Sequence, residues 1–143
     1  MDSCESILKM ERLVFDRIEF ARKGFANNEK FRYQLGIDIG RNDEENMYRV
    51  SVSISGEKQN EYSLFVKLSG FFCVEGGKEV SEDMKNGLMS KNAVAIMLPY
   101  LRNQVSVLTS QPYTESVVLP LLNVQSLFEN MHKVRKEEEK DNE

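Results

Sequence analysis

The stretch AVAIMLPYLRNQVSVLTSQPYTESVVLPLLNVQSLF, residues 93–128, decides the fold of this chain. Its apolar residues recur at helical spacing from Val94 to Leu108, which predicts a helix of about five turns over residues 91–111. The run 93–98 has no polar residue, so more than one face of this helix is apolar. Either the apolar connector 117–122 or another copy of the chain must therefore cover it, because large apolar patches are rarely left exposed.

Pro99 lies inside the predicted helix. A proline there removes a backbone hydrogen bond and clashes with the preceding turn, at a cost of about 3 kcal/mol. We therefore expect tertiary contacts to offset that cost by burying a kinked helix. Asn92 or Ser90 is expected to cap its first turn.

The residues before this helix alternate between apolar and polar side chains, the period-2 pattern of strands with one wet face. Short polar connections between consecutive strands favour an antiparallel meander. Gly70, inside the last strand, predicts a bulge or a close backbone approach, and the apolar run after it predicts burial on both faces. The strands are expected at Leu13–Phe20, Phe31–Ile39, Tyr48–Ile54 and Tyr62–Val74.

Shorter elements complete the layout. Glu79–Met89 predicts a short helix capped by Ser81, and Asn123 is expected to cap a last helix that runs to about Lys133. Residues 134–143 are almost wholly charged and predict a disordered tail, whereas residues 1–12 fit either a short helix or disorder. The prediction is one α+β domain over residues 1–143, with a four-stranded antiparallel meander, a long helix, an apolar connector and a short C-terminal helix.

The order of motifs in the second half resembles the SecB protein-export chaperones. In that family a helix bearing Pro-Tyr-x-Arg leads through a proline-containing apolar connector into Asn-x-x-x-Leu-Phe. Here these motifs stand at Pro99-Tyr100-Leu101-Arg102, at 119–123 and at 123–128. With the four strands before them, the resemblance extends from about Leu13 to Met131. It implies a homotetramer, built as a dimer of dimers, that binds unfolded or non-native polypeptides without ATP.

A client chain exposes apolar side chains, and burying them gains about 25 cal/mol per Å² of apolar area. Adaptable residues such as Met97 beside rigid aromatic rings would give broad specificity. The candidate client-binding residues are Tyr100, Leu119, Leu121, Val124, Phe128 and Phe72. The candidate oligomer-interface residues are Ile96, Leu98, Leu101 and Val105. Each of the helix residues is also consistent with a place in the core.

In the SecB family, acidic residues on the outer sheet face help to dock the SecA motor ATPase. The alignment places Arg17 and Ala21 at the acidic positions of the first strand, and Phe65 at the acidic position of the fourth. The chain therefore lacks these docking residues. Asp16 and Glu19 lie nearby, but using them requires a register shift that moves their side chains to the other face.

Composition and charge limit the function classes. The net charge of −4 and the absence of an isolated basic run argue against nucleic acid as a partner. Cys4 and Cys73 are the only cysteines, which excludes a disulfide framework and favours the cytoplasm. Residues 1–14 have no continuous apolar core of a secretory signal, and no run reaches the roughly 20 apolar residues of a membrane span.

An enzyme is not expected. The one histidine, His132, lies beside the charged tail, and neither a nucleophile motif nor a phosphate-binding loop occurs. We predict no metal site and no cofactor. Three functions remain: a general holdase, a chaperone dedicated to one client such as an antitoxin, and a small-ligand or scaffold protein with a closed groove.

Overall fold

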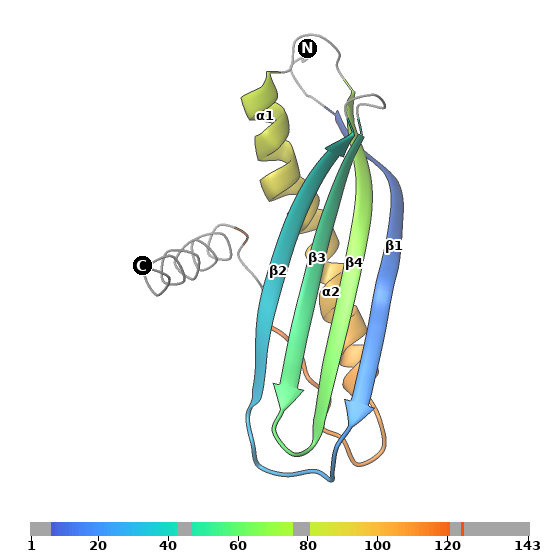
Figure 1. Ribbon diagram of the computed structural model, residues 1–143, viewed down its shortest axis with the longest axis vertical. Helices are drawn as coiled ribbons and strands as arrows, with labels where there is room; N and C mark the ends of the chain where they lie inside the picture. Colours follow the sequence, from blue (N-terminus) through green and yellow to red (C-terminus); the bar gives the residue numbers. More distant parts are fainter. Residues whose placement is uncertain (1–6, 43–46, 76–80, 121–123, 125–143) are drawn as a thin grey trace, which may run out of the picture.

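The computed structural model describes residues 7–42, 47–75, 81–120 and 124 (Figure 1). An antiparallel sheet forms one layer, and a helical run packed on one of its faces forms the other. The predicted α+β class is therefore confirmed. The last helix, expected over residues 123–133, and the predicted tail fall outside the described residues except for Val124.

The four strands are β1 (Ile7–Arg22), β2 (Phe31–Asn42), β3 (Met47–Lys58) and β4 (Tyr62–Glu75). Their order in the sheet is β1-β4-β3-β2. The meander prediction holds for β2, β3 and β4, whereas β1 pairs with β4 instead of β2. Residues 23–30 make this possible by crossing one end of the sheet (Figure 1), where the N–H groups of Lys23 and Gly24 donate to the Glu61 carbonyl at 2.8 and 3.1 Å.

β1 begins earlier than predicted, because residues 7–12 extend the strand along β4 instead of forming a helix or remaining disordered. Two register shifts leave Glu11 and Asp16 as extra residues. Each bulge inserts a spacing of three between apolar residues on the same face, at Met10 and Leu13 and again at Phe15 and Ile18. This spacing hid the period-2 pattern. The bulges thus lie in β1, not at Gly70.

The helical layer is one continuous run of α1 (Glu82–Gly87), the π-helical segment η2 (Leu88–Ala93) and α2 (Val94–Thr109). Ser81 caps α1 as predicted, accepting a hydrogen bond from the Met84 N–H at 3.2 Å. The predicted cap of the long helix at Asn92 or Ser90 is wrong. The chain is already helical before α2 begins. Carbonyl groups of the preceding turn therefore accept hydrogen bonds from the first N–H groups of α2, and no side-chain cap is needed.

Pro99 does lie inside α2, where its side chain and that of Tyr100 are exposed. The buried side of α2 consists of Val94, Met97, Leu98, Leu101, Val105 and Thr109. These residues recur at spacings of three and four, so they form one stripe on the helix. They rest on the inner-face residues of the central strands β3 and β4.

Gly70 lies on the inner face of β4, where Met97 of α2 packs closely on the strand. A Cβ added there would lie 2.5 Å from Phe72 Cε2 and 3.0 Å from Met97 Sδ, which confirms the predicted close approach. Beyond Gly70, Phe72 and Val74 are buried on the inner face, whereas Phe71 and Cys73 are only half-buried on the outer face. The expected burial on both faces is therefore met on one.

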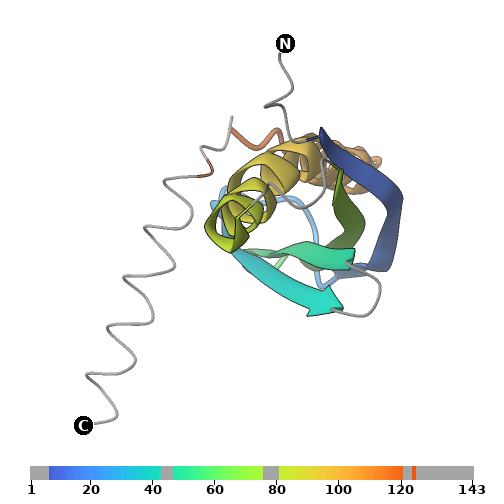
Figure 2. The same cartoon turned by 90° about the horizontal axis from the view of Figure 1, so that it is seen from above.

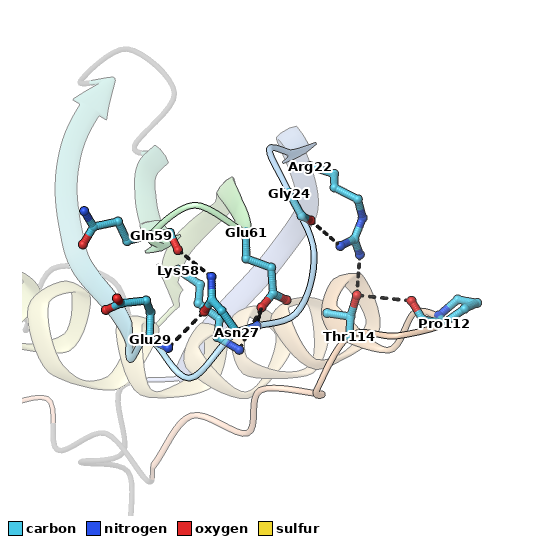
Figure 3. Close-up of polar contacts among 9 residues, drawn as sticks. All are labelled: Arg22, Gly24, Asn27, Glu29, Lys58, Gln59, Glu61, Pro112 and Thr114. Atoms are coloured by element: carbon cyan, nitrogen blue, oxygen red, sulfur yellow. Dashed lines mark hydrogen bonds and ion pairs between the residues drawn. The ribbon is translucent and has the colours of Figure 1, made fainter.

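A buried ion pair holds the end of the sheet where β3 turns into β4 (Figure 3). Lys58 Nζ lies 2.9 Å from Glu61 Oε1, which also accepts the Asn27 N–H at 3.1 Å. Burial alone would raise the pKa of Glu61, but the hydrogen bonds from Lys58 and Asn27 outweigh it and lower that pKa. The side-chain amide of Asn27 also donates to the Gln59 carbonyl at 2.9 Å. These bonds fix the 23–30 connection to the β3–β4 turn.

We expect Gly70→Ala to destabilise the protein by about 1–3 kcal/mol, because the new methyl group has no space between two buried side chains. Urea unfolding followed by circular dichroism measures the change. Gly40→Ala is the matched control, since a Cβ at this strand position meets no atom within 4 Å. Equal stability of the two variants would contradict the close packing of α2 on β4.

Candidate functional site

One helix is too narrow to cover this sheet. An α-helix with its side chains is about 10–12 Å wide, whereas neighbouring strands are about 4.8 Å apart, so one helix covers roughly two strands. α2 packs on β3 and β4, and the sheet curves around the helical run (Figure 2). The edge strands β1 and β2 therefore flank the helix on either side.

The inner faces of both edge strands carry apolar side chains that are only partly covered. On β2, Tyr33 and Ile39 are each 38% exposed. On β1, Ile18 is 45% exposed, and Met10 and Phe15 are slightly less so. Their partners on the central strands, such as Val50 opposite Ile39 and Val66 opposite Ile18, are fully buried. Two apolar rows thus lie beside the helix.

The outward side of α2 adds a third apolar element, formed by Ile96, Tyr100 and Val107. Tyr100 is 48% exposed and Val107 is 56% exposed. These residues follow one another at intervals of four and seven, so they form a stripe opposite the buried one. We call Ile96, Tyr100 and Val107 the outer stripe.

Segment 110–120 is held against α2 by three polar side chains of the helix. Arg102 Nε and Nη2 donate to the Leu119 carbonyl at 3.2 and 3.1 Å. Ser106 Oγ donates to the Val117 carbonyl at 2.9 Å, and Thr109 Oγ1 accepts the Val117 N–H at 2.8 Å. The arginine of the Pro-Tyr-x-Arg motif therefore fixes the connector to the helix at Leu119.

Two grooves follow from this arrangement. The larger, of about 560 Å³, lies along the junction of η2 and α2 and is lined by Lys91, Asn92, Ala95, Ile96 and Val124. The smaller, of about 220 Å³, lies between α2 and the connector and is lined by Pro99, Arg102, Asn103, Ser106, Val118 and Leu119. Val118 is 75% exposed at its rim. An extended chain could place apolar side chains along both grooves and the outer stripe.

The predicted client-binding residues separate into three groups. Tyr100 is exposed, and Val124 lines the larger groove. Phe72 is buried within the protomer and supports the surface from below, whereas Leu119, also buried, contributes to the floor of the smaller groove. Leu121 and Phe128 lie outside the described residues.

The predicted interface residues also differ in their exposure. Ile96 is 40% exposed and lines the larger groove. Leu98, Leu101 and Val105 belong to the protomer core, packed against β3 and β4. Of these four, Ile96 alone is accessible for contact with another subunit.

The edge-strand rows were missed by sequence reasoning. Tyr33 and Ile39 occupy the apolar phase of the clearest alternating strand, and that pattern predicts burial without saying how far the covering layer extends. Met10, Phe15 and Ile18 were further obscured by the bulges in β1. One sequence signal could have revealed the rows. A single long helix is too narrow to cover all four predicted strands, so some apolar side chains of the sheet must stay uncovered.

The outer face of the sheet is polar and well paired. The Arg17 guanidinium lies 5.3 Å from the centre of the Phe65 ring and also bonds Glu19 at 2.7 Å. The bulge brings the Asp16 carboxylate to the Ser69 hydroxyl and to Arg49 on this face. The expectation that Asp16 and Glu19 need a register shift is therefore wrong, because both reach the outer face in the observed register.

The described part of the chain contains no group of three or more His, Cys, Asp and Glu side chains arranged to hold a metal ion. No helix in the described ranges is both long and apolar enough to cross a membrane. Cys73 is half-buried on the outer face, and burial, followed by its contact with the Glu11 carboxylate, raises the pKa of its thiol. A raised pKa keeps the thiol protonated and weakly reactive.

This chain has a relative that is similar in sequence over most of its length. No protein-family model matches the chain. The uncharacterized protein MJ0357 of Methanocaldococcus jannaschii is 27% identical over 139 residues, which cover 91% of this chain and 88% of that protein.

Among solved structures, the Mycobacterium tuberculosis SecB-like chaperone Rv1957, in complex with a ChAD peptide from the Rv1956 HigA1 antitoxin, superposes with a TM-score of 0.66. The match covers 81% of this chain and 88% of that chain at 15% identity. A Streptococcus agalactiae protein of unknown function gives a TM-score of 0.48 at 12% identity, over 82% of this chain and 100% of that one. The chain thus has a SecB-like fold.

We expect Arg102→Leu to release the connector, because two charged hydrogen bonds to the Leu119 carbonyl are lost at about 1.5–3 kcal/mol each. Limited proteolysis should then cut within residues 110–120 at least several-fold faster. Arg102→Lys is the matched control; it keeps the charge but cannot donate the same two bonds, so it should fall between wild type and leucine. Unchanged proteolysis of the leucine variant would show that the connector is held by other contacts.

Proposed function

We propose that this protein is an ATP-independent chaperone that holds non-native polypeptides on the apolar surface around α2. The observation that carries the proposal is the set of apolar side chains left partly exposed on β1, on β2 and at Tyr100 of α2, with grooves beside them. The SecB-like fold supports it, because the similar chain from Mycobacterium tuberculosis binds a peptide of an antitoxin.

The chemistry of such a surface fits extended chains of varied sequence. Each buried Å² of apolar area contributes about 25 cal/mol, whatever the identity of the side chain. Tyr33 and Tyr100 offer rigid rings, whereas Val118 and Val124 offer aliphatic contacts along the grooves. Leu121 and Phe128 remain proposed contacts from the sequence, and Leu119 and Phe72 provide the packing beneath.

A chaperone dedicated to one client is the second candidate. The observation that favours it is the outer face of the sheet, where Arg17 and Phe65 stack at positions that the SecB family uses for acidic residues. A cation and an aromatic ring there do not suit docking of the SecA motor, so export coupling is not part of the proposal. A panel of unrelated unfolded proteins distinguishes the two roles, because a general holdase protects many clients and a dedicated chaperone protects one.

We further propose a homotetramer, arranged as a dimer of dimers. Ile96 and Val107 on the outer stripe of α2 are apolar and exposed in the protomer, and the edges of β1 and β2 have no neighbouring strand within the described residues. Exposed apolar stripes and unpaired edges are the features through which subunits associate. Of the interface residues predicted from the sequence, Ile96 is the proposed contact, because its side chain is accessible in the protomer.

Client capture should weaken when a charge is placed on the β2 row. We expect Tyr33→Asp to raise several-fold the concentration of protein needed to suppress aggregation of an unfolded client, since a carboxylate disrupts apolar contact. Gln34→Asp, on the opposite face of the same strand, is the matched control and should behave as wild type. The same assay applied to Leu121→Asp tests the connector.

Circular dichroism must show that each of these variants is folded. A folded Tyr33→Asp variant with normal capture would remove the β2 row from the binding surface. Normal capture by a folded Leu121→Asp variant would remove the connector. If the wild type protects no client at all, the chaperone proposal itself fails.

Analytical ultracentrifugation tests the assembly. We expect a species near four times the 16.5 kDa protomer mass, and Val107→Asp should shift it to smaller species by placing a charge on the outer stripe. Asn103→Asp, also exposed on α2 but polar to begin with, serves as the control. A wild-type monomer at all concentrations would overturn the tetramer without affecting the apolar surface.

A further inference from the structure

The two edges of the sheet differ in how well they are protected against pairing with another chain. β1 carries two bulges, at Glu11 and Asp16, which interrupt its backbone geometry. β2 pairs with β3 over twelve consecutive residues without a register shift, and it contains no proline. Bulges and prolines are devices that blunt an edge strand. Along residues 31–40, β2 therefore presents a regular backbone edge with no neighbouring strand in the described part of the chain (Figure 1).

The side chains of β2 form one apolar row and one polar row. On the outer face, Arg32 and Asp38 are both exposed, and neither forms an ion pair within the described residues. Gln34 and Gly36, which carry no charge, lie between them. The inner-face row is wholly apolar and consists of Phe31, Tyr33, Leu35, Ile37 and Ile39.

These rows are complementary to a second copy of β2 that runs in the opposite direction. When the two-fold axis passes through Leu35, Arg32 lies opposite Asp38 of the partner subunit, and the pair occurs twice because the contact is symmetric. On the inner face, Tyr33 then lies opposite Ile37 of the partner subunit. Directly opposed side chains have Cβ atoms about 4.5–5.5 Å apart, which permits both ion pairs and apolar contact.

The charges select this register. Pairing must keep both apolar rows on one face, so the axis passes through a residue and not between two. An axis at Gly36 places Arg32 opposite Gly40 and Asp38 opposite Gln34, so neither charge meets an opposite charge. An axis at Gln34 leaves Arg32 opposite Gly36, and an axis at Asp38 sets two carboxylates against each other. An axis at Leu35 thus satisfies both charges.

We propose that β2 pairs with β2 of a second copy of this chain, antiparallel and with Leu35 on the two-fold axis. The inference rests on the proposed tetramer and deepens it, because this edge and the outer stripe then supply the two interfaces of the dimer of dimers. Tyr33 and Ile39 stay on the inner face. The joined sheet therefore places the apolar rows of two protomers side by side, and one extended polypeptide contacts both.

A cysteine on the axis tests the register in the full chain, with Cys4 and Cys73 replaced by serine. Leu35→Cys sets two thiols opposite each other at a Cα separation of about 4.5–5.5 Å, which a disulfide spans. We expect oxidation with diamide to give a covalent dimer. Ile37→Cys is the matched control, because its two copies lie about 14 Å apart along the paired strands and cannot be bridged.

Charge reversal tests the ion pairs. Arg32→Asp and Asp38→Arg each set like charges opposite each other, so each should raise the dissociation constant of this interface at least about tenfold. Ultracentrifugation should then show a dimer held by the outer stripe. A mixture of the two variants restores both ion pairs and should restore the tetramer. Arg12→Asp, the same reversal on the exposed outer face of β1, is the control.

Circular dichroism must show that each variant is folded. Absence of the Leu35→Cys dimer, equal cross-linking of Ile37→Cys, or a mixture that fails to reassemble would overturn the proposal. Dissociation by Arg12→Asp and not by Arg32→Asp would also overturn it and assign the pairing to β1. So would a disulfide that Leu35→Cys forms with a cysteine-containing client but not with a second copy. Protection of clients by the wild type is measured separately, so failure of this pairing is distinguishable from failure of the chaperone proposal.

Discussion

The widths of a helix and a sheet govern the surface of this protein. One helical run can cover about two strands, and here it covers the two central ones. The inner faces of β1 and β2 are as apolar as those of β3 and β4, so part of the apolar area stays in contact with water. The sheet is wider than the helix along the whole length of α2, so the uncovered apolar surface is elongated. An extended chain fits such a surface, which is the basis of the proposed function.

Rigid packing beneath that surface keeps it open. At Gly70 the sheet meets Met97 and Phe72 with no space for a methyl group, so α2 cannot shift toward either edge strand without displacing buried side chains. At the end of the sheet, the Lys58–Glu61 pair joins the β3–β4 turn to the 23–30 connection.

Most of the fold could be predicted from local pattern. Alternation revealed β2, β3 and β4, and Ser81 marked the start of α1. The errors have identifiable physical causes. Bulges at Glu11 and Asp16 gave β1 a mixed period, and no local signal says that the strand crosses over to pair with β4, because that pairing depends on contacts far apart in the sequence. In the candidate site, Tyr100 and Ile96 were predicted as accessible contacts, whereas Tyr33, Ile39 and Ile18 were not.

Local spacing and side-chain size were enough to identify the apolar side chains and the phase they occupy in β2, β3 and β4, because both are properties of neighbouring residues in the sequence. Which of these apolar residues are covered depends on contacts between elements that lie far apart in the sequence. Leu119 and Phe72 became core while Tyr33 and Ile39 stayed half-exposed, because burial depends on the strand over which α2 lies and not on the residue itself.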